Sequence, residues 1–425
     1  MMRKVIIRVC IVAFILVSLF ILVGCEKRDD LFINGVQYAY DDYSDTYKVR
    51  EITFWAGWKV IIRSEINGKP VTTLDGESQW MKLPAVARIV IIPETVTRVE
   101  WNFVRYCRKL VYNEDSDGYY LGSKDNPYFL FVRPKEDEVA EQYNYVSNIE
   151  IEPAIKETPV TPPYNSSDSG VVSCRINENC KLLIDGAFAN SENLRSITIP
   201  GNIKTISSYA FAECENLETI ILEEGVEKIA REAFKSCVNL KYIDFPSSIR
   251  EIGDCAFCSC YAIESFEIPE GVITLGTAFE WCYNLKEIFI PSTVTNMDCI
   301  SYECLALEKI EVSENNPYYK SIDGIVYSKD GTVLIRYPAA KQDETFKIPD
   351  GVKKICSNAF FDNYYVKNIV IPKSVVEIEN YFRSYSVENV YYCGNTEAWK
   401  KINYNTSVDF YHATVFLNCD YEDYE

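Results

Sequence analysis

The chain has 425 residues, of which 48% are hydrophobic and 25% charged, a balance typical of folded proteins. Its net charge of −19 excludes nucleic acid and anionic lipid surfaces as favoured partners, although the same charge can serve solubility alone. His412 is the only histidine, which leaves almost no room for a Ser-His-Asp or Cys-His nucleophile system or for a His-rich zinc site. We therefore expect no enzyme activity and no cofactor.

The first 24 residues have the parts of a secretory signal peptide. A basic start over residues 1–8 precedes an apolar run over residues 9–23, which ends in Leu22-Val23-Gly24-Cys25. This tetrad resembles the bacterial lipobox, which implies cleavage after Gly24 and a diacylglycerol on the thiol of Cys25. Acyl chains would anchor the chain to a membrane, since each buried methylene contributes roughly 0.8 kcal/mol. The alternative is an uncleaved signal anchor, because residues 5–23 are almost long enough to span a bilayer.

A repeat of about 23 residues runs through much of the remaining chain. Its clearest mark is a phenylalanine that follows an alanine, at Phe188, Phe211, Phe234, Phe257, Phe279 and, further on, Phe360. A cysteine stands three residues after this position in five successive units, at Cys214, Cys237, Cys260, Cys282 and Cys304. One unit cannot bury its own apolar side, so stacked units must share one core.

Each unit predicts a short strand and a short helix. Residues 197–199 alternate in polarity, which predicts a strand, and Pro200 ends it because proline cannot donate to the ladder. The Ala-Phe-x-x-Cys-x-x-Leu segment that comes earlier in each unit has helical spacing, which predicts one or two helical turns. We expect the cysteine column to face the core as a ladder of free thiols, because free cysteine behaves as a small buried hydrophobe.

This pattern resembles the BspA-like leucine-rich repeat family of bacterial surface proteins. Residues 66–71 and 92–96 look like the family's opening unit, residues 120–128 and 315–332 like its hairpin inserts, and residues 390–399 like its closing cap. The resemblance implies an α/β solenoid, a right-handed superhelix of ~23-residue units with short strands and short helices, capped at both ends. Two units depart from the pattern: Phe103-Val104 replaces Ala-Phe, and Ser301 stands where the aromatic is expected.

We divide the chain into six segments on this basis. They are a signal peptide (1–24), a tether and N-terminal cap (25–65), irregular early repeats with a hairpin insert (66–155), a flexible break (156–170), the regular solenoid (171–390), and a C-terminal cap with an acidic tail (391–425). The break is expected because residues 156–170 are rich in proline, serine and glycine.

Strand positions that point away from the core form one extended face in a solenoid, and we take this face as the candidate binding surface. It should comprise Ser196, Thr198, Thr219, Ile221, Tyr242, Asp244, Ser265, Glu267, Glu287, Phe289, Lys309 and Glu311. Tyr242, Phe289 and Ile221 are possible anchors, since aromatic groups ringed by polar ones resemble binding hot spots. An ordinary sheet surface is the alternative interpretation.

Other motifs carry weaker signals for chemistry. Cys255-x-x-Cys258 with Cys260 has the spacing of a zinc half-site, but no second half and no histidine accompany it, so no metal site is expected. Cys174 and Cys180 bracket a short loop and could form a local disulfide. The run from Asn113 to Gly118 begins like a calcium loop, but Lys124 stands where a glutamate is needed, which favours a polar turn.

Two functions from different classes fit these observations. The resemblance implies capture of a protein ligand, such as a host matrix protein or a surface protein of another bacterium, by a lipid-anchored protein on the cell surface. The alternative is a structural scaffold within the bacterial envelope that holds a partner protein of the same cell. Location separates them, because only an adhesin must face outward.

Overall fold

The computed structural model describes residues 31–34, 36–52, 59–74, 87–100, 103, 110, 112–114, 118–122, 125–126, 129–134, 173–297, 301–379, 386–402 and 413–424. Its contacts divide the chain into two compact units, Met1–Val111 and Tyr112–Glu425, which are described separately. The predicted signal peptide, Cys25 and the break at 156–170 lie outside the described residues. Within the described part, none of the helices combines the length and the apolar character that a membrane crossing needs.

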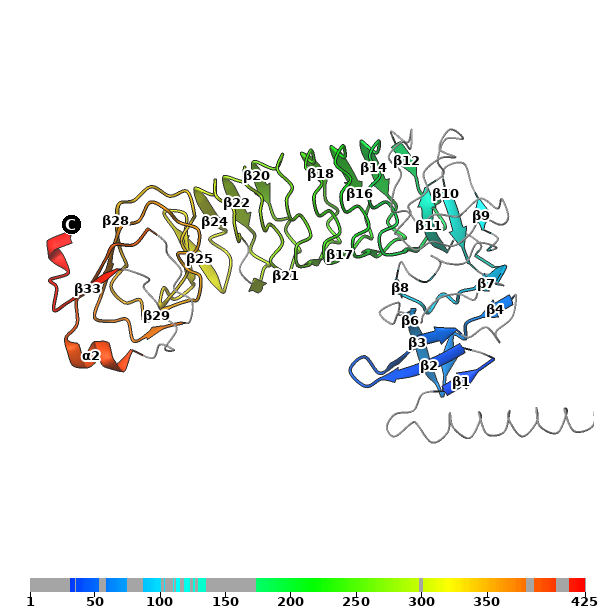
Figure 1. Cartoon of the computed structure of the whole chain (residues 1–425), viewed down its shortest axis with the longest axis horizontal. Coiled ribbons are helices and arrows are strands. Elements are labelled where there is room, and N and C mark those ends of the chain that lie inside the picture. The colour runs from blue at the N-terminus through cyan, green and yellow to red at the C-terminus, as the bar shows by residue number, and fades with distance from the viewer. Residues whose placement is uncertain are drawn as a thin grey trace, which may run out of the picture. The chain divides into compact units, whose positions relative to one another are not determined.

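The first unit is built on one mixed sheet (Figure 1). Strands β1 (Leu31–Ile33), β2 (Val36–Asp41) and β3 (Thr46–Ile52) form an antiparallel meander, and β6 (Lys69–Leu74) pairs with β3 in parallel, flanked by β5 (Glu65–Ile66) and β8 (Arg98–Val99). Strands β4 (Lys59–Ile61) and β7 (Ile89–Ile91) form a separate parallel pair. Aromatic and branched residues of the first unit form its core, where Tyr38, Val49, Val71 and Leu74 are buried.

The second unit opens with the first of the two expected hairpin inserts. Strand β10 (Gly118–Leu121) pairs with β9 (Asn113–Glu114) and β11 (Leu130–Pro134) in antiparallel fashion, and β13 (Leu182–Leu183) then adds to β11 in parallel. This last pairing joins the hairpin to the first regular coil, so that Phe131 of β11 stacks on Phe188 with ring centroids 4.7 Å apart.

The regular region is a β-solenoid in which each coil adds one strand to each of two faces (Figure 1). One face holds β12 (Ser173–Arg175), β14 (Ser196–Ile199), β16 (Thr219–Leu222) and β18 (Tyr242–Asp244), then β20 (Ser265–Glu267), β22 (Glu287–Ile290) and β24 (Lys309–Val312). The other face holds β15 (Thr205–Ile206), β17 (Lys228–Ile229), β19 (Glu251–Ile252), β21 (Thr274–Leu275) and β23 (Asn296–Met297). All pairs between neighbouring coils on these two faces are parallel, as the repeat requires.

The predicted short helices within the repeat units are wrong. The Ala-Phe-x-x-Cys segment forms consecutive turns, and in most units the residues two before and two after the phenylalanine have left-handed backbone, as at Glu232 (φ 55°) and Ser236 (φ 59°). The amide of Phe234 donates to Ala256 O in the next coil at 2.8 Å, a bond that an α-helix would make within itself. The three-residue spacing therefore reflects turns tied to the next coil. In the described residues the only α-helix is α2 (Thr396–Lys401), near the C-terminus.

Two stacked columns fill the core of the regular coils. The phenylalanine rings lie nearly parallel, with centroids 4.9 Å apart for Phe188 and Phe211 and 5.2 Å apart for Phe211 and Phe234. The thiol ladder is confirmed: all five cysteines are buried and none of them is in a disulfide, namely Cys214, Cys237, Cys260, Cys282 and Cys304. Each thiol also donates to the carbonyl of a phenylalanine in the preceding coil, as Cys237 Sγ does to Phe211 O at 3.1 Å. The cysteine column therefore fills space in the core and also gives one buried turn carbonyl in each coil a hydrogen-bond donor.

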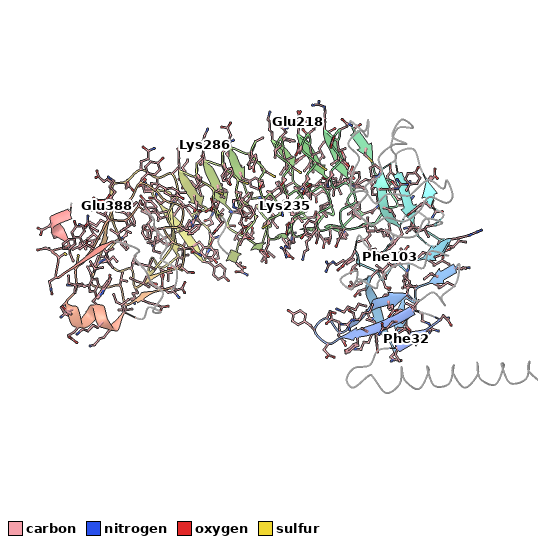
Figure 2. All side chains as sticks on the ribbon, viewed as in Figure 1. Phe32, Phe103, Glu218, Lys235, Lys286 and Glu388 are labelled. Carbon is pink, nitrogen blue, oxygen red and sulfur yellow. The ribbon has the colours of Figure 1, made fainter. Side chains whose placement is uncertain are left out.

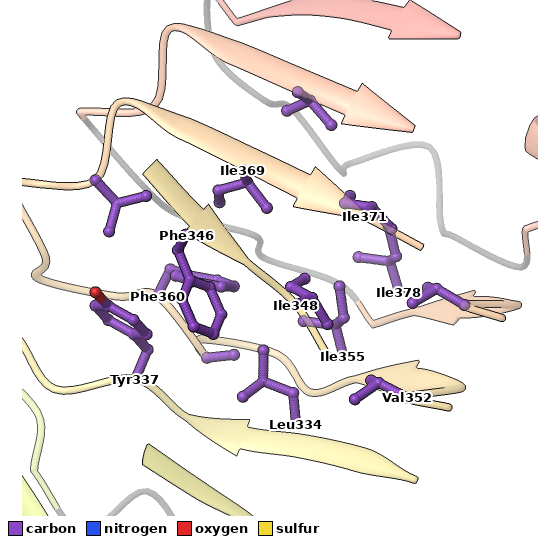
Figure 3. Close-up of a cluster of buried hydrophobic side chains, with 14 of the residues drawn as sticks. Leu334, Tyr337, Phe346, Ile348, Val352, Ile355, Phe360, Ile369, Ile371 and Ile378 are labelled. Atoms are coloured by element: carbon purple, nitrogen blue, oxygen red, sulfur yellow. The ribbon is translucent and has the colours of Figure 1, made fainter. Parts of the chain in front are cut away.

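The second expected hairpin is also present, and it begins the C-terminal part of the solenoid. Strands β25 (Tyr319–Ile322) and β26 (Ile325–Ser328) are joined by Asp323 and Gly324, both with positive φ, and β27 (Val333–Arg336) pairs back on β26. Parallel coils then resume with β28 (Thr345–Lys347), β29 (Lys354–Ile355), β30 (Asn368–Ile371), β31 (Glu377–Ile378), β32 (Asn389–Tyr392) and β33 (Thr414–Leu417). Their shared core, seen in Figure 3, includes Leu334, Tyr337, Phe346 and Phe360.

The unit that lacks its aromatic is completed by an arginine from this hairpin. Arg336 is 4% exposed, and its guanidinium donates to Ser301 Oγ at 3.1 Å, Ser301 O at 2.7 Å and Asn358 O at 2.7 Å. Asp362, 4.0 Å away and also buried, accepts a bond from the Glu303 amide at 2.6 Å. The next residue, Tyr337, restores the aromatic column by stacking on Phe360 at 5.3 Å. The small side chain of Ser301 therefore leaves room for the buried guanidinium of Arg336 and accepts a hydrogen bond from it.

This arrangement predicts a pH-dependent contribution to stability. Burial raises the pKa of Asp362 from 3.8 to about 6, against the lowering effects of the Glu303 amide and Arg336. Because the folded-state pKa is the higher one, the carboxyl stabilises the fold fully below pH 3.8 and loses that contribution as the pH rises through about 6.

We expect the unfolding free energy of wild type to fall by roughly 3 kcal/mol relative to Asp362→Asn between about pH 4 and 7. Asparagine suits the site because it tolerates the positive φ of 67° found there. Urea denaturation of both proteins across this range measures the difference, and a difference that does not change with pH would contradict the assignment.

Candidate binding surface

The predicted face is formed by side chains that alternate with buried ones along the first set of strands. In β16, Ile220 and Leu222 are buried, whereas Ile221 is 38% exposed. The register aligns equivalent positions of successive coils, which places Ser196, Thr219 and Tyr242 in one row and Thr198, Ile221 and Asp244 in the next. In the later coils the rows are Ser265, Glu287 and Lys309, and Glu267, Phe289 and Glu311.

The twelve residues lie on two sheets and not on one continuous sheet. Strands β12, β14, β16 and β18 form the first, and β20, β22 and β24 form the second. The break falls where Phe266 occupies a column of isoleucines and packs against Phe257 at 5.2 Å and Phe279 at 4.6 Å. The bulkier ring in this column accompanies the change of sheet. The repeat spacing between β18 and β20 is regular, so the 23-residue period did not predict this division into two sheets.

Within the face, Glu287 and Lys309 form an ion pair, and two further pairs stand beside the strand starts. Lys309 contacts Glu287 at 2.6 Å, Arg195 contacts Glu218 at 3.1 Å and Lys286 contacts Glu264 at 2.9 Å. Figure 2 shows Glu218 and Lys286 along the same edge of the solenoid. The hydrogen bond from Lys286 lowers the pKa of Glu264. Exposed pairs of this kind contribute little to stability, and the face as a whole stays acidic, with Asp244, Glu267, Glu287 and Glu311 against Lys309.

The exposed apolar side chains of the face are the candidate anchors. Tyr242 is 56% exposed, as predicted for an anchor, whereas Phe289 is half-buried and presents less of its ring. Near Ile221 the face is hollowed by a depression of about 500 Å³. It is lined by Ser173, Cys174, Ile176, Glu178, Ser196, Ile197, Thr198, Pro200, Ile221 and Glu223. Three of the predicted face residues, Ser196, Thr198 and Ile221, thus line this hollow. Residues of β12 and two glutamates also line it.

Sequence reasoning missed a second exposed apolar row. Tyr261 and Tyr283 stand four residues after the phenylalanine of their units, and their rings stack at 5.5 Å while both remain exposed. Leu305 holds the same position in the next unit and is 40% exposed. This row follows the same period as the core columns, so a search for exposed columns in the repeat would have found it.

A third set of side chains could hold a metal ion. Cys255, Cys258 and Glu280 place one thiol or carboxylate atom each within 4.8 Å of the other two. The prediction of no metal site rested on the missing second half of the motif, and it did not consider Glu280, which the next coil supplies. Cys174 and Cys180, the proposed local disulfide, are both buried and are not bonded to each other in the structure. His412, Lys124 and the acids of the calcium-like loop at 115 and 117 lie outside the described residues.

The repeats match a family described as BspA type leucine rich repeat region, in six copies over residues 164–277, 204–322 and 340–421. No curated protein matches the chain.

Three solved structures are similar to the chain. A leucine-rich repeat protein from Eubacterium ventriosum is 26% identical with a TM-score of 0.43, over 50% of this chain and 56% of that one, so this chain spans little more than half of its length. One from Bacteroides ovatus is 16% identical, with a TM-score of 0.46, and the match covers 92% of this chain and 100% of that one. A leucine rich cell surface protein from Faecalibacterium prausnitzii is 17% identical, with a TM-score of 0.36, and the match covers 94% of this chain and 97% of that one.

Proposed function

This chain belongs to the BspA-type leucine-rich repeat family, and from that premise we propose that it is a non-catalytic, lipid-anchored protein that binds a protein ligand at the bacterial cell surface. The lipid would be carried by Cys25, at the end of the signal peptide over residues 1–24. The ligand would be a host matrix protein or a surface protein of another bacterium.

The observation that carries this proposal is the outward face of β14, β16 and β18. Tyr242 and Ile221 stand exposed among polar and acidic side chains, beside the hollow of about 500 Å³. Parallel pairing between coils holds these side chains in fixed register, so binding costs little conformational entropy. A rigid apolar centre within a polar rim suits a protein partner better than a small polar ligand.

Location is tested by treating intact cells of the source bacterium with protease and following the chain by immunoblot, with Cys25→Ala alongside. We expect rapid loss of wild type, and release or incomplete processing of the variant, because lipidation needs the thiol. Full protection of wild type would overturn the surface assignment and favour the alternative function, a scaffold inside the envelope that holds a protein of the same cell.

The binding face is tested with the same cells on immobilised fibronectin, laminin and fibrinogen. We expect Tyr242→Ser combined with Ile221→Ser to weaken attachment by about tenfold or more, as loss of hot-spot side chains does. Tyr318→Ser is the matched control, since Tyr318 is 53% exposed but lies outside these strands, just before β25. Equal attachment of all three strains would remove this face from the proposal.

A further inference from the structure

Two cysteines and a glutamate from neighbouring coils converge at the turn after β19. Cys255 and Cys258 flank Phe257, and Glu280 directly follows Phe279, one coil further along. Cys255 Sγ lies 3.5 Å from Glu280 Oε2, and the donor atoms of all three residues lie within 4.8 Å of one another. Among the described residues this is the one group of three or more cysteine, histidine or acidic side chains that meets this distance.

The backbone fixes the relative position of these three donors. The Cys258 amide donates to Cys255 O at 3.1 Å within the turn, and Cys255 has a left-handed φ of 52°. Two bonds then join the turn to the next coil, from the Cys255 amide to Thr277 O at 3.2 Å and from the Ser259 amide to Glu280 O at 2.9 Å. Because the coil-to-coil ladder holds the main chain, the side chains need only small rotations to meet at one point.

The packing of the solenoid does not account for these two thiols. Cys260 belongs to the buried ladder and donates to Phe234 O at 3.2 Å, whereas Cys255 and Cys258 stand outside that column. One coil earlier, the positions equivalent to Cys255 and Cys258 hold Glu232 and Lys235, which form an ion pair at 2.7 Å. In the first coils the same positions hold Gly186 and Ala189, then Tyr209 and Ala212. Cys258 is buried where the first coils hold buried alanines, but Cys255 is half-buried at a position that elsewhere holds Gly, Tyr and Glu, so packing alone does not explain why two cysteines meet here.

We propose that Cys255, Cys258 and Glu280 bind one zinc ion, with the fourth coordination position open to water or to a ligand. Thiolate and carboxylate ligands suit zinc, and thiolates disfavour magnesium and calcium. A tetrahedral ion with Zn–S bonds of about 2.3 Å places two sulfurs about 3.8 Å apart, so the donors must approach by about 1 Å at most. Cys258 is buried, while Cys255 and Glu280 are half-buried, which leaves an entry path on their side.

The charges around the site are balanced once the ion is bound. Three anionic ligands and a divalent cation leave one negative charge. In the preceding coil Arg231 and Lys235 both contact Glu232, at 2.8 Å and 2.7 Å, which leaves one positive charge beside the site. Both cations interact electrostatically with the cysteines, Arg231 with Cys255 and Lys235 with Cys258. The residues around the donors thus offset the residual charge of a zinc complex.

The test uses the full chain, purified and reduced without air, and titrated with cadmium and zinc ions. We expect cadmium to produce a thiolate-to-metal charge-transfer absorption that saturates at one ion per chain. Zinc, measured by competition with a chromophoric chelator, should bind at least about tenfold more weakly to Glu280→Gln and to Cys255→Ser than to wild type. Cys356→Ser is the matched control, because Cys356 is a half-buried thiol near Glu379 without a second thiol beside it.

Three results would overturn the proposal. The first is the absence of a charge-transfer band in wild type that is folded by circular dichroism. The second is the same zinc affinity in Glu280→Gln, Cys255→Ser and the Cys356→Ser control. The third is a Cys255–Cys258 disulfide that forms in air at a rate unaffected by saturating zinc, which would identify the pair as a redox couple. Retained zinc binding in Cys356→Ser together with its loss in the two site variants would support the proposal.

Discussion

Arg336→Met is expected to lower the free energy of unfolding by about 3–5 kcal/mol, the usual cost of removing one partner from a buried charged network. The substitution removes all three bonds that the guanidinium makes to Ser301 and to Asn358 O. It also leaves the buried carboxyl of Asp362 without its neighbouring cation. Urea denaturation at pH 7, followed by tryptophan fluorescence, to which Trp281 and Trp399 of the second unit contribute, measures the loss.

Arg250→Met is the control for this substitution. Arg250 also donates to backbone carbonyls, Ser247 O at 2.7 Å and Ile249 O at 2.8 Å, but it is exposed, so water can replace both bonds. We expect a loss below about 1 kcal/mol there. Adding Asp362→Asn to Arg336→Met should recover part of the larger loss, because the buried acid is gone. Purely additive effects of the two substitutions would argue against coupling between Arg336 and Asp362.

Phe234→Ala is expected to cost about 3–5 kcal/mol and to divide the unfolding of the solenoid into two transitions. The ring of Phe234 lies between Phe211 at 5.2 Å and Phe257 at 5.5 Å, and it is fully buried. Its removal leaves a cavity in the middle of the column. Because each coil contacts only its neighbours, the coils on either side should then unfold more independently.

Calorimetry of the full chain measures both effects of this change. The control is Phe289→Ala, which removes the same ring from a half-buried position on the outer face, and for which a loss below about 1 kcal/mol and an unchanged number of transitions are expected. A single sharp transition in Phe234→Ala, with no loss of stability, would show that the phenylalanine column does not couple the coils.

The sequence predicted those features that every repeat unit contains. The 23-residue period, the strand at 197–199 (observed as 196–199), the buried cysteine column and the two hairpins were all predicted, because each depends on residues close together in the chain or on identical neighbours in the stack. The outward residues of the strands could likewise be named, since alternation in a strand fixes which side chains point away from the core.

The same pattern did not predict the conformation of the connecting turns. Ala-Phe-x-x-Cys spacing fits a helix as well as a pair of turns. Bonds such as Phe234 N to Ala256 O decide between them, and these bonds exist only when the next coil is in place. The helix prediction failed for this reason, since local spacing says nothing about which partner an amide selects.

What the sequence determined by itself, then, is the repeat, its two core columns and the family to which the chain belongs. Tertiary structure alone decided how the exceptions are accommodated: Arg336 reaches back 35 residues to Ser301, Phe266 coincides with the division of the outer face into two sheets, and Glu280 joins a cysteine pair 22 residues before it. The physical reason is common to all three. A solenoid brings residues of neighbouring coils into contact whether or not they stand one full period apart in the chain, so an irregular residue acquires its role from a neighbouring coil and not from its own segment.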